Sequence, residues 1–176
     1  MKEKTSLLED ILLALIPYTK ENITLAFNPG KFFYQLEKKH NINKQSAYST
    51  FYRAKKQGYL QEVEKEGQKS LSLTAKGRVK ILKHLVKNKK LTWDGQWRIL
   101  FFDIPEKYRK KRDILRTKLR ELDFKKYQLS VWISPYDYTE EIQLLIDELM
   151  IVPYVQYLVA KAISGERELK IFFDLK

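Results

Sequence analysis

The chain has 176 residues, 44% of them hydrophobic and 32% charged, which is enough for one large or two small globular domains. It has no cysteine, which excludes disulfides and thiolate metal sites, and its two histidines, His40 and His84, lie far apart in sequence. Because neither histidine has a ligand-like spacing, neither a zinc site nor a nucleophilic catalytic triad is expected. The formal net charge is +12, which points to an anionic partner.

The positive charge is concentrated in the first half of the chain. Residues 1–92 hold 19 Lys and Arg against 8 Asp and Glu, a net charge of +11, whereas residues 93–176 hold 15 against 14, a net charge of +1. Such asymmetry indicates a polyanion as the partner of the basic half. The alternative is a surface that only keeps the protein in solution.

No segment resembles an export signal or a membrane span. The most apolar early stretch, residues 7–16, contains Glu9 and Asp10, and no stretch reaches the roughly 18 apolar residues that a membrane span needs. We therefore expect a cytoplasmic protein without a membrane partner.

Three helices are predicted in the first half. Apolar residues at helical spacing predict the first over residues 7–16. The turn signal Asn28-Pro29-Gly30 precedes a second, short helix that ends near His40. The third begins after Asn43, a favourable N-cap, and stops at Gly58, because glycine adopts the left-handed conformation without strain.

The third helix has the residue pattern of a DNA-recognition helix. Ala47, Phe51 and Ala54 follow core spacing. The opposite face carries short polar residues and one arginine, which are Gln45, Ser46, Ser49, Thr50 and Arg53. Small residues let a helix approach the major groove, where Arg and Gln bond base edges. The alternative is an ordinary solvated face.

A hairpin and a last helix complete this half. Residues 60–63 and 69–73 are predicted strands, and the charged stretch Glu64–Gln68 between them contains a glycine, which is typical of a hairpin turn. Thr74 is the expected cap of a final helix.

The succession of two helices, "SAYSTFYRAKKQGYL", a hairpin and "LTAKG" resembles the winged helix-turn-helix family of bacterial regulators. The resemblance implies a recognition helix in the major groove and a wing on the neighbouring backbone. It implies that Lys65 and Lys69 are the phosphate contacts of the wing, and that Lys44, Lys55 and Lys56 flank the recognition helix. Glu64 and Glu66 depart from this pattern, since acidic residues at the wing tip would repel phosphate.

The second half is predicted to be an α+β domain. The domain boundary is placed at Leu91, which gives a DNA-binding domain over residues 1–91 and a second domain over 92–176. Strands are expected over 97–104, 127–132, 154–160 and 169–175, and residues 133–138 continue the second of them or turn back as a further strand. Helices are expected over 106–122 and 139–150. This order, βαββαβ with an extra strand, indicates a ferredoxin-like fold.

The predicted last strand is also the predicted dimer contact. Leu169, Ile171, Phe173 and Leu175 alternate with polar residues, and Phe172 interrupts the polar face. An exposed phenylalanine beside an open strand edge is suited to contact a second subunit. We therefore expect a homodimer that forms through sheet edges.

An arginine stripe marks the first helix of this domain. Arg109, Arg112, Arg116 and Arg120 recur at helical spacing. They could bind phosphate bidentately, or pair with acidic residues of the domain or of a second subunit. We favour pairing, because acidic residues outnumber basic ones over residues 127–176.

The string "WDGQWRILFFDIPEKYRKKRDILRTKLRELDF" followed by "YQLSVWISPYD" resembles the central domain of PaaX-type transcriptional repressors, and it is similar to small CRISPR-associated ferredoxin-like proteins of the spacer-adaptation complex. The resemblance implies a sequence-specific regulator of double-stranded DNA, a repressor that is not an enzyme and needs no cofactor. The family has a further region where this chain ends at Lys176, so no effector is assigned, including an aryl-coenzyme A thioester.

The CRISPR-associated relatives suggest two alternatives. In them an Asp at the end of the first strand is a metal ligand of a nuclease, and Asp103 matches that position. Two such carboxylates across a dimer would suit Mg²⁺. The structural alternative is that Asp103 caps the helix starting near Glu106 or stabilises its N-terminus. A spacer-adaptation component that binds DNA without cutting it is the other alternative.

Overall fold

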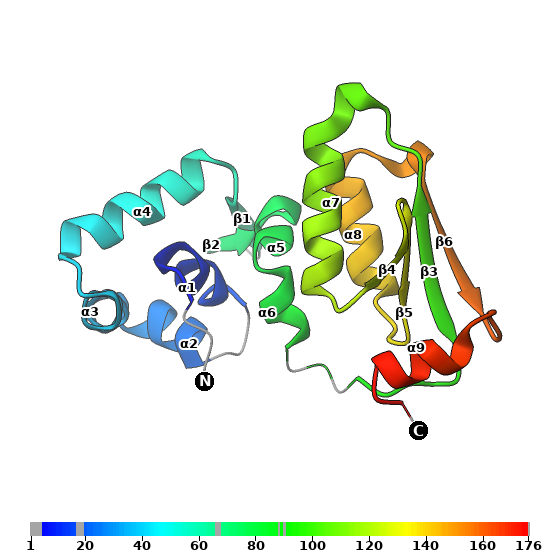
Figure 1. Ribbon diagram of the computed structural model, residues 1–176. Helices are drawn as coiled ribbons and strands as arrows, with labels where there is room; N and C mark the ends of the chain where they lie inside the picture. The colour runs from blue at the N-terminus through cyan, green and yellow to red at the C-terminus, as the bar shows by residue number, and fades with distance from the viewer. Residues whose placement is uncertain (1–4, 17–19, 66–67, 88, 90, 176) are drawn as a thin grey trace. The chain divides into compact units, whose positions relative to one another are not determined.

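The computed structural model describes residues 5–16, 20–65, 68–87, 89 and 91–175. The chain divides into two compact units, Met1–His84 and Leu85–Lys176 (Figure 1). Each unit contains a hydrophobic core cluster of its own.

The first unit consists of helices followed by a hairpin. Its elements are α1 (Leu7–Leu13), α2 (Lys20–Phe27), α3 (Pro29–His40), α4 (Lys44–Lys56), β1 (Leu60–Lys65), β2 (Gln68–Leu73) and α5 (Ala75–Lys80), and α6 (Leu82–Val86) runs into the second unit. Helix α2 was not predicted, and the predicted last helix is interrupted at Ile81. The winged helix-turn-helix assignment of this unit stays a prediction.

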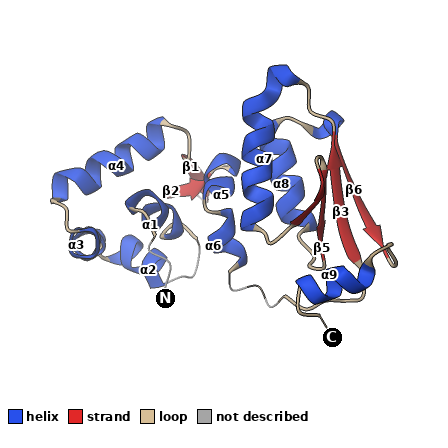
Figure 2. Cartoon of the chain, viewed as in Figure 1, coloured by secondary structure: helices blue, strands red, loops and turns tan. Residues whose placement is uncertain are grey.

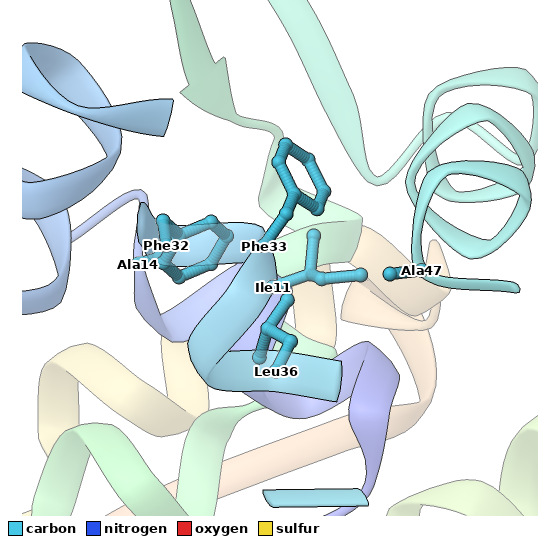
Figure 3. Packing of buried hydrophobic residues seen from close by; sticks show 6 residues of the cluster. All are labelled: Ile11, Ala14, Phe32, Phe33, Leu36 and Ala47. Atoms are coloured by element: carbon cyan, nitrogen blue, oxygen red, sulfur yellow. The ribbon is translucent and has the colours of Figure 1, made fainter. Parts of the chain in front are cut away.

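The core of the first unit joins three helices (Figure 3). It comprises Ile11 and Ala14 of α1, Phe32, Phe33 and Leu36 of α3, and Ala47 of α4. The small side chain at position 47 lets α4 approach α1 closely, and this packing positions the outward face of α4.

Local caps set the ends of these helices. The side chain of Asn43 accepts a hydrogen bond of 2.8 Å from the backbone N–H of Ser46, and Thr74 accepts one of 3.0 Å from Gly77. After α4 the chain reverses through Gly58, whose φ is +74°. These predicted start and stop signals are therefore confirmed.

The second unit is a ferredoxin-like α+β domain. Its elements are β3 (Trp97–Phe102), the 3₁₀ turn η1 (Glu106–Tyr108), α7 (Arg109–Glu121), β4 (Lys125–Gln128), β5 (Val131–Ser134), α8 (Thr139–Leu149), the 3₁₀ turn η2 (Val152–Tyr154), β6 (Val155–Ala160) and α9 (Glu166–Phe172). The sheet is antiparallel, in the order β4-β5-β3-β6. Helices α7 and α8 lie together on one face of it (Figure 2).

The predicted extra strand over residues 169–175 is wrong, because this segment forms helix α9. Leu169 is buried against Trp97 and Ile133, and Phe173, one turn later, packs on the same cluster. Ile171, which a strand would have placed beside Leu169, is 72% exposed. The apolar residues at 169 and 173 follow helical spacing, and the neighbouring Glu, Arg and Lys favour a helix.

Candidate nucleic-acid interface

Helix α4 presents a continuous basic and polar face. The exposed residues of the helix are Lys44, Gln45, Tyr48, Ser49, Tyr52, Arg53, Lys55 and Lys56, and all but Lys55 recur on this face at helical spacing. The helix Lys44–Lys56 contains four basic residues and no acidic one. Of the predicted base readers, Ser46 and Thr50 are half-buried at the margin of this face.

Several polar side chains of the face are hydrogen-bonded within the helix. The hydroxyls of Ser49 and Thr50 donate to the carbonyl oxygen of Ser46, over 3.0 and 2.9 Å. Arg53 donates through Nη2 to the Thr50 hydroxyl, over 3.2 Å. This chain of bonds orients the guanidinium along the exposed face, and it occupies the hydroxyl hydrogens that could have bonded bases.

The hairpin β1–β2 follows α4 directly. Its strands pair antiparallel from Leu60↔Leu73 to Lys65↔Gln68. Lys55 at the end of α4 forms an ion pair with Glu62 of β1, which ties the helix to the hairpin. The side chains of Lys65 and Lys69, the predicted wing contacts, lie outside the part of the chain that the structure describes.

A buried carboxylate connects α1 to the end of α3. Asp10 accepts hydrogen bonds from Lys39 Nζ at 2.9 Å and the Thr5 hydroxyl at 2.6 Å, and it lies 2.7 Å from His40 Nε2. Burial alone would raise the pKa of Asp10, but the hydrogen bonds from Lys39, Thr5 and His40 outweigh it and hold the pKa below its usual range. Sequence patterns gave no sign of this network, because Lys39 and His40 are distant from Asp10 along the chain.

The face of α4 also carries aromatic side chains that sequence reasoning missed. Tyr48 is 41% exposed and Tyr52 is 68% exposed. The Tyr48 ring stacks on Phe33 with centroids 4.2 Å apart, and Lys44 Nζ lies 5.8 Å from its centroid. Their spacing of four residues could have identified them, since it places both on one face.

The arginine stripe of α7 is largely engaged within its own unit. Arg112 donates to Glu106 at 2.8 Å and to the carbonyl oxygen of Ile104 at 3.1 Å. Looser pairs join Arg109 to Glu106 and Arg116 to Asp113. Three of the four arginines thus have acidic partners nearby in sequence.

The fourth arginine of the stripe has different surroundings. Arg120 is exposed, and its guanidinium lies over the Trp132 ring at 5.9 Å. It lines a shallow hollow with Phe124 and Phe172, and Lys125 Nζ lies 4.0 Å from the centroid of the Phe172 ring. Contacts of the stripe with phosphate or a second subunit remain a prediction.

Arg98 is a buried charged residue within the apolar strand β3 that sequence reasoning did not single out. It is 4% exposed and holds both carboxylate oxygens of Asp94, at 2.5 and 2.8 Å, with Asp137 at 3.4 Å. The hydrogen bond from Arg98 lowers the pKa of Asp94, and hydrogen bonds from Thr139 lower that of Asp137. These bonds fix the segment before β3 to the start of α8.

Asp103 is exposed at the end of β3, and its backbone N–H donates to the carbonyl oxygen of Tyr154 at 2.9 Å. Asp103 does not cap the following helix, because the N-cap residues are Pro105 for η1 and Tyr108 for α7 and neither start has a side-chain cap hydrogen bond. Stabilisation of the helix N-terminus by its charge stays a prediction. In the described residues no three His, Asp or Glu side chains gather closely enough to hold a metal ion.

Comparison with known families finds a match for the second unit. Residues 90–171 match the family model described as the PaaX protein central Cas2-like domain. This part of the chain belongs to the PaaX-type family. The match begins before β3 and ends one residue short of the end of α9. The arginine stripe and Asp103 therefore both lie in the PaaX-type domain, whereas α4 and the hairpin precede it.

The match relates residues 90–171 to PaaX-type regulators in general. A search of curated proteins finds no match. None of the helices in the described ranges has the length and apolar character that crossing a bilayer requires.

Proposed function

We propose that this chain is a sequence-specific, double-stranded-DNA-binding transcriptional repressor of the PaaX type, which acts in the cytoplasm as a homodimer and without a cofactor. The observation that carries the proposal is the face of α4. This face is exposed, basic and free of acidic residues. The opposite side of α4 packs on the core through the small side chain of Ala47, and a hairpin follows the helix. Together these are the features of a helix that enters the major groove.

The proposed contacts fall into two kinds. Gln45, Ser49 and Arg53 face base edges, where Arg bonds guanine and Gln bonds adenine. Lys44 and Lys56 at the ends of the helix bind backbone phosphates, as do Lys65 and Lys69 of the hairpin. Phosphate contacts supply affinity and base contacts supply selectivity.

The homodimer of this proposal no longer rests on a last strand. It rests on β6, which ends the sheet order and so leaves one edge unpaired. Leu158 and Val159 of β6 are 49% and 52% exposed, and Phe101 of the adjacent β3 is 38% exposed. Pairing across this edge would cover apolar surface, and two recognition helices would then read two half-sites about 34 Å apart or multiples of that.

A titration of genomic fragments tests the proposal. The full chain is mixed with random fragments at two salt concentrations, with and without Mg²⁺, and retained DNA is sequenced. Retention of a few intact fragments, weakened by salt, is the expected result. Retention without any selectivity would refute sequence-specific binding, and shortened fragments that need Mg²⁺ and vanish in Asp103→Ala would make the protein a nuclease.

Transcription in vitro tests the sign of regulation. A promoter that carries a retained fragment should be transcribed less when the protein is added. An increase would make the protein an activator while leaving DNA binding intact.

A further inference from the structure

The exposed face of α4 carries two aromatic rings among its basic and polar residues. Tyr48 and Tyr52 stand four residues apart, so their rings lie one turn apart on the same face. At 41% and 68% exposure they are the most exposed aromatic side chains of this helix. Arg53 and Lys56 flank them on the same face.

The Tyr48 ring is held in place before any ligand arrives. It stacks nearly parallel on Phe33, with an interplanar angle of 20°, and Phe33 is itself only 5% exposed in the core. Lys44 Nζ lies 5.8 Å from the Tyr48 centroid. A ring that is already oriented loses little conformational entropy on binding, so its contacts contribute fully to affinity.

The hydroxyl groups on this face, unlike the two rings, are already engaged within the helix. Ser49 and Thr50 donate their hydrogens to the carbonyl of Ser46, inside the helix. Ser49 therefore presents an oxygen acceptor outward and no donor, and the half-buried Thr50 oxygen already accepts from Arg53. Selectivity from the middle of the helix must come largely from Arg53 and from the two rings.

We propose that Tyr48 and Tyr52 help to select the operator by packing their rings on thymine C5-methyl groups in the major groove. The methyl group is the apolar feature by which the major groove displays thymine. The inference rests on the proposed function of α4 as the recognition helix. It predicts that the operator carries thymines at the positions facing these rings.

The test uses the full chain and an operator that the wild-type protein has selected from random fragments. Each thymine of the operator is replaced singly by deoxyuridine, which removes the methyl group and keeps the base pair. At the contacted positions the affinity of the wild type should fall about fourfold, the value expected for one buried methyl group. Elsewhere it should not change.

Protein variants then show which ring makes the contact. Tyr52→Ala should bind thymine and deoxyuridine operators equally at one of these positions, whereas Tyr52→Phe, which keeps the ring, should still discriminate. Tyr48→Ala should lose discrimination at a second position. Tyr34→Ala is the matched control, because Tyr34 is 57% exposed but lies on α3, and it should discriminate as the wild type does.

The outcomes separate this inference from the proposed function. If an operator is selected but both alanine variants keep the wild-type preference for thymine, the inference is overturned and the recognition helix stands. If the wild type selects no operator, both fall. Thermal melting of each variant checks that it is folded. The substitutions of Tyr52 should leave the melting temperature unchanged, because this side chain is 68% exposed.

Discussion

Arg53 is the side chain on which base selectivity depends most. Arg53→Ala should weaken binding to the selected operator by about 1–3 kcal/mol while leaving binding to random DNA nearly unchanged, because a base contact is lost and most phosphate contacts stay. Competition gel shifts measure both affinities. Arg109→Ala, which removes an exposed arginine from the PaaX-type domain, is the control, and an equal loss of affinity on all sequences would exclude base readout by Arg53.

Asp10 should control the stability of the first unit in a pH-dependent way. Asp10→Asn removes a charge that accepts hydrogen bonds from Lys39 and Thr5, so the free energy of unfolding should fall by about 1–3 kcal/mol at neutral pH. The pKa of Asp10 is lowered in the folded state. Its contribution is therefore complete above the pKa of the unfolded chain and is lost as the pH falls through the folded pKa.

Urea unfolding followed by circular dichroism at several pH values tests this expectation. The difference between wild type and Asp10→Asn should be largest near neutral pH and shrink on acidification below the ordinary carboxyl pKa. A difference that stays constant with pH would mean that the carboxylate charge contributes nothing.

At the scale of elements, helix α5 packs so closely that only glycine fits at one position. A Cβ on Gly77 would lie 2.3 Å from the carbonyl oxygen of Tyr59, a backbone atom that cannot move alone. Gly77→Ala should therefore destabilise the protein by about 1–3 kcal/mol. Gly30→Ala is the matched control, because its nearest atom would lie 3.8 Å away, and a melting temperature lowered equally in both variants would contradict the close contact.

The character of α9 gives a second prediction at this scale. Leu169→Ala should lower the free energy of unfolding by about 2–5 kcal/mol, because the side chain is buried against Trp97, whereas Ile171→Ala should change it by less than about 0.5 kcal/mol. A strand would place both residues on one face. Similar losses of unfolding free energy in the two variants would therefore favour a strand over a helix in this segment.

The contrast between α4 and α9 shows what the sequence could and could not predict. Helix α4 was predicted to within a residue or two, because Asn43 and Gly58 mark its ends and Ala47 and Ala54 its buried face. For α9 the apolar residues fit both strand alternation and helical spacing over a short stretch, and the burial of Leu169 and Phe173 against Trp97 shows which of the two patterns the chain uses. The same limit applies to the contacts of Asp10 with Lys39 and His40 and to that of Arg98 with Asp137, because these join parts of the chain far apart in sequence.

At the scale of the whole molecule, binding to DNA should depend steeply on salt. Residues 1–92 carry a net charge of +11, and each phosphate that a Lys or Arg neutralises releases counterions. A plot of log affinity against log salt concentration should be linear, and Lys65→Ala should reduce its slope by about one unit. An unchanged slope would remove this hairpin residue from the phosphate contacts.

The distribution of tryptophan has a practical consequence for spectroscopy. All three tryptophans, Trp93, Trp97 and Trp132, belong to the second unit, and the first unit has none. Intrinsic tryptophan fluorescence therefore reports directly on the PaaX-type domain alone. If Asp10→Asn shifts the transition seen by circular dichroism but not that seen by fluorescence, the two units unfold independently, and if both transitions shift together, they unfold as one cooperative system.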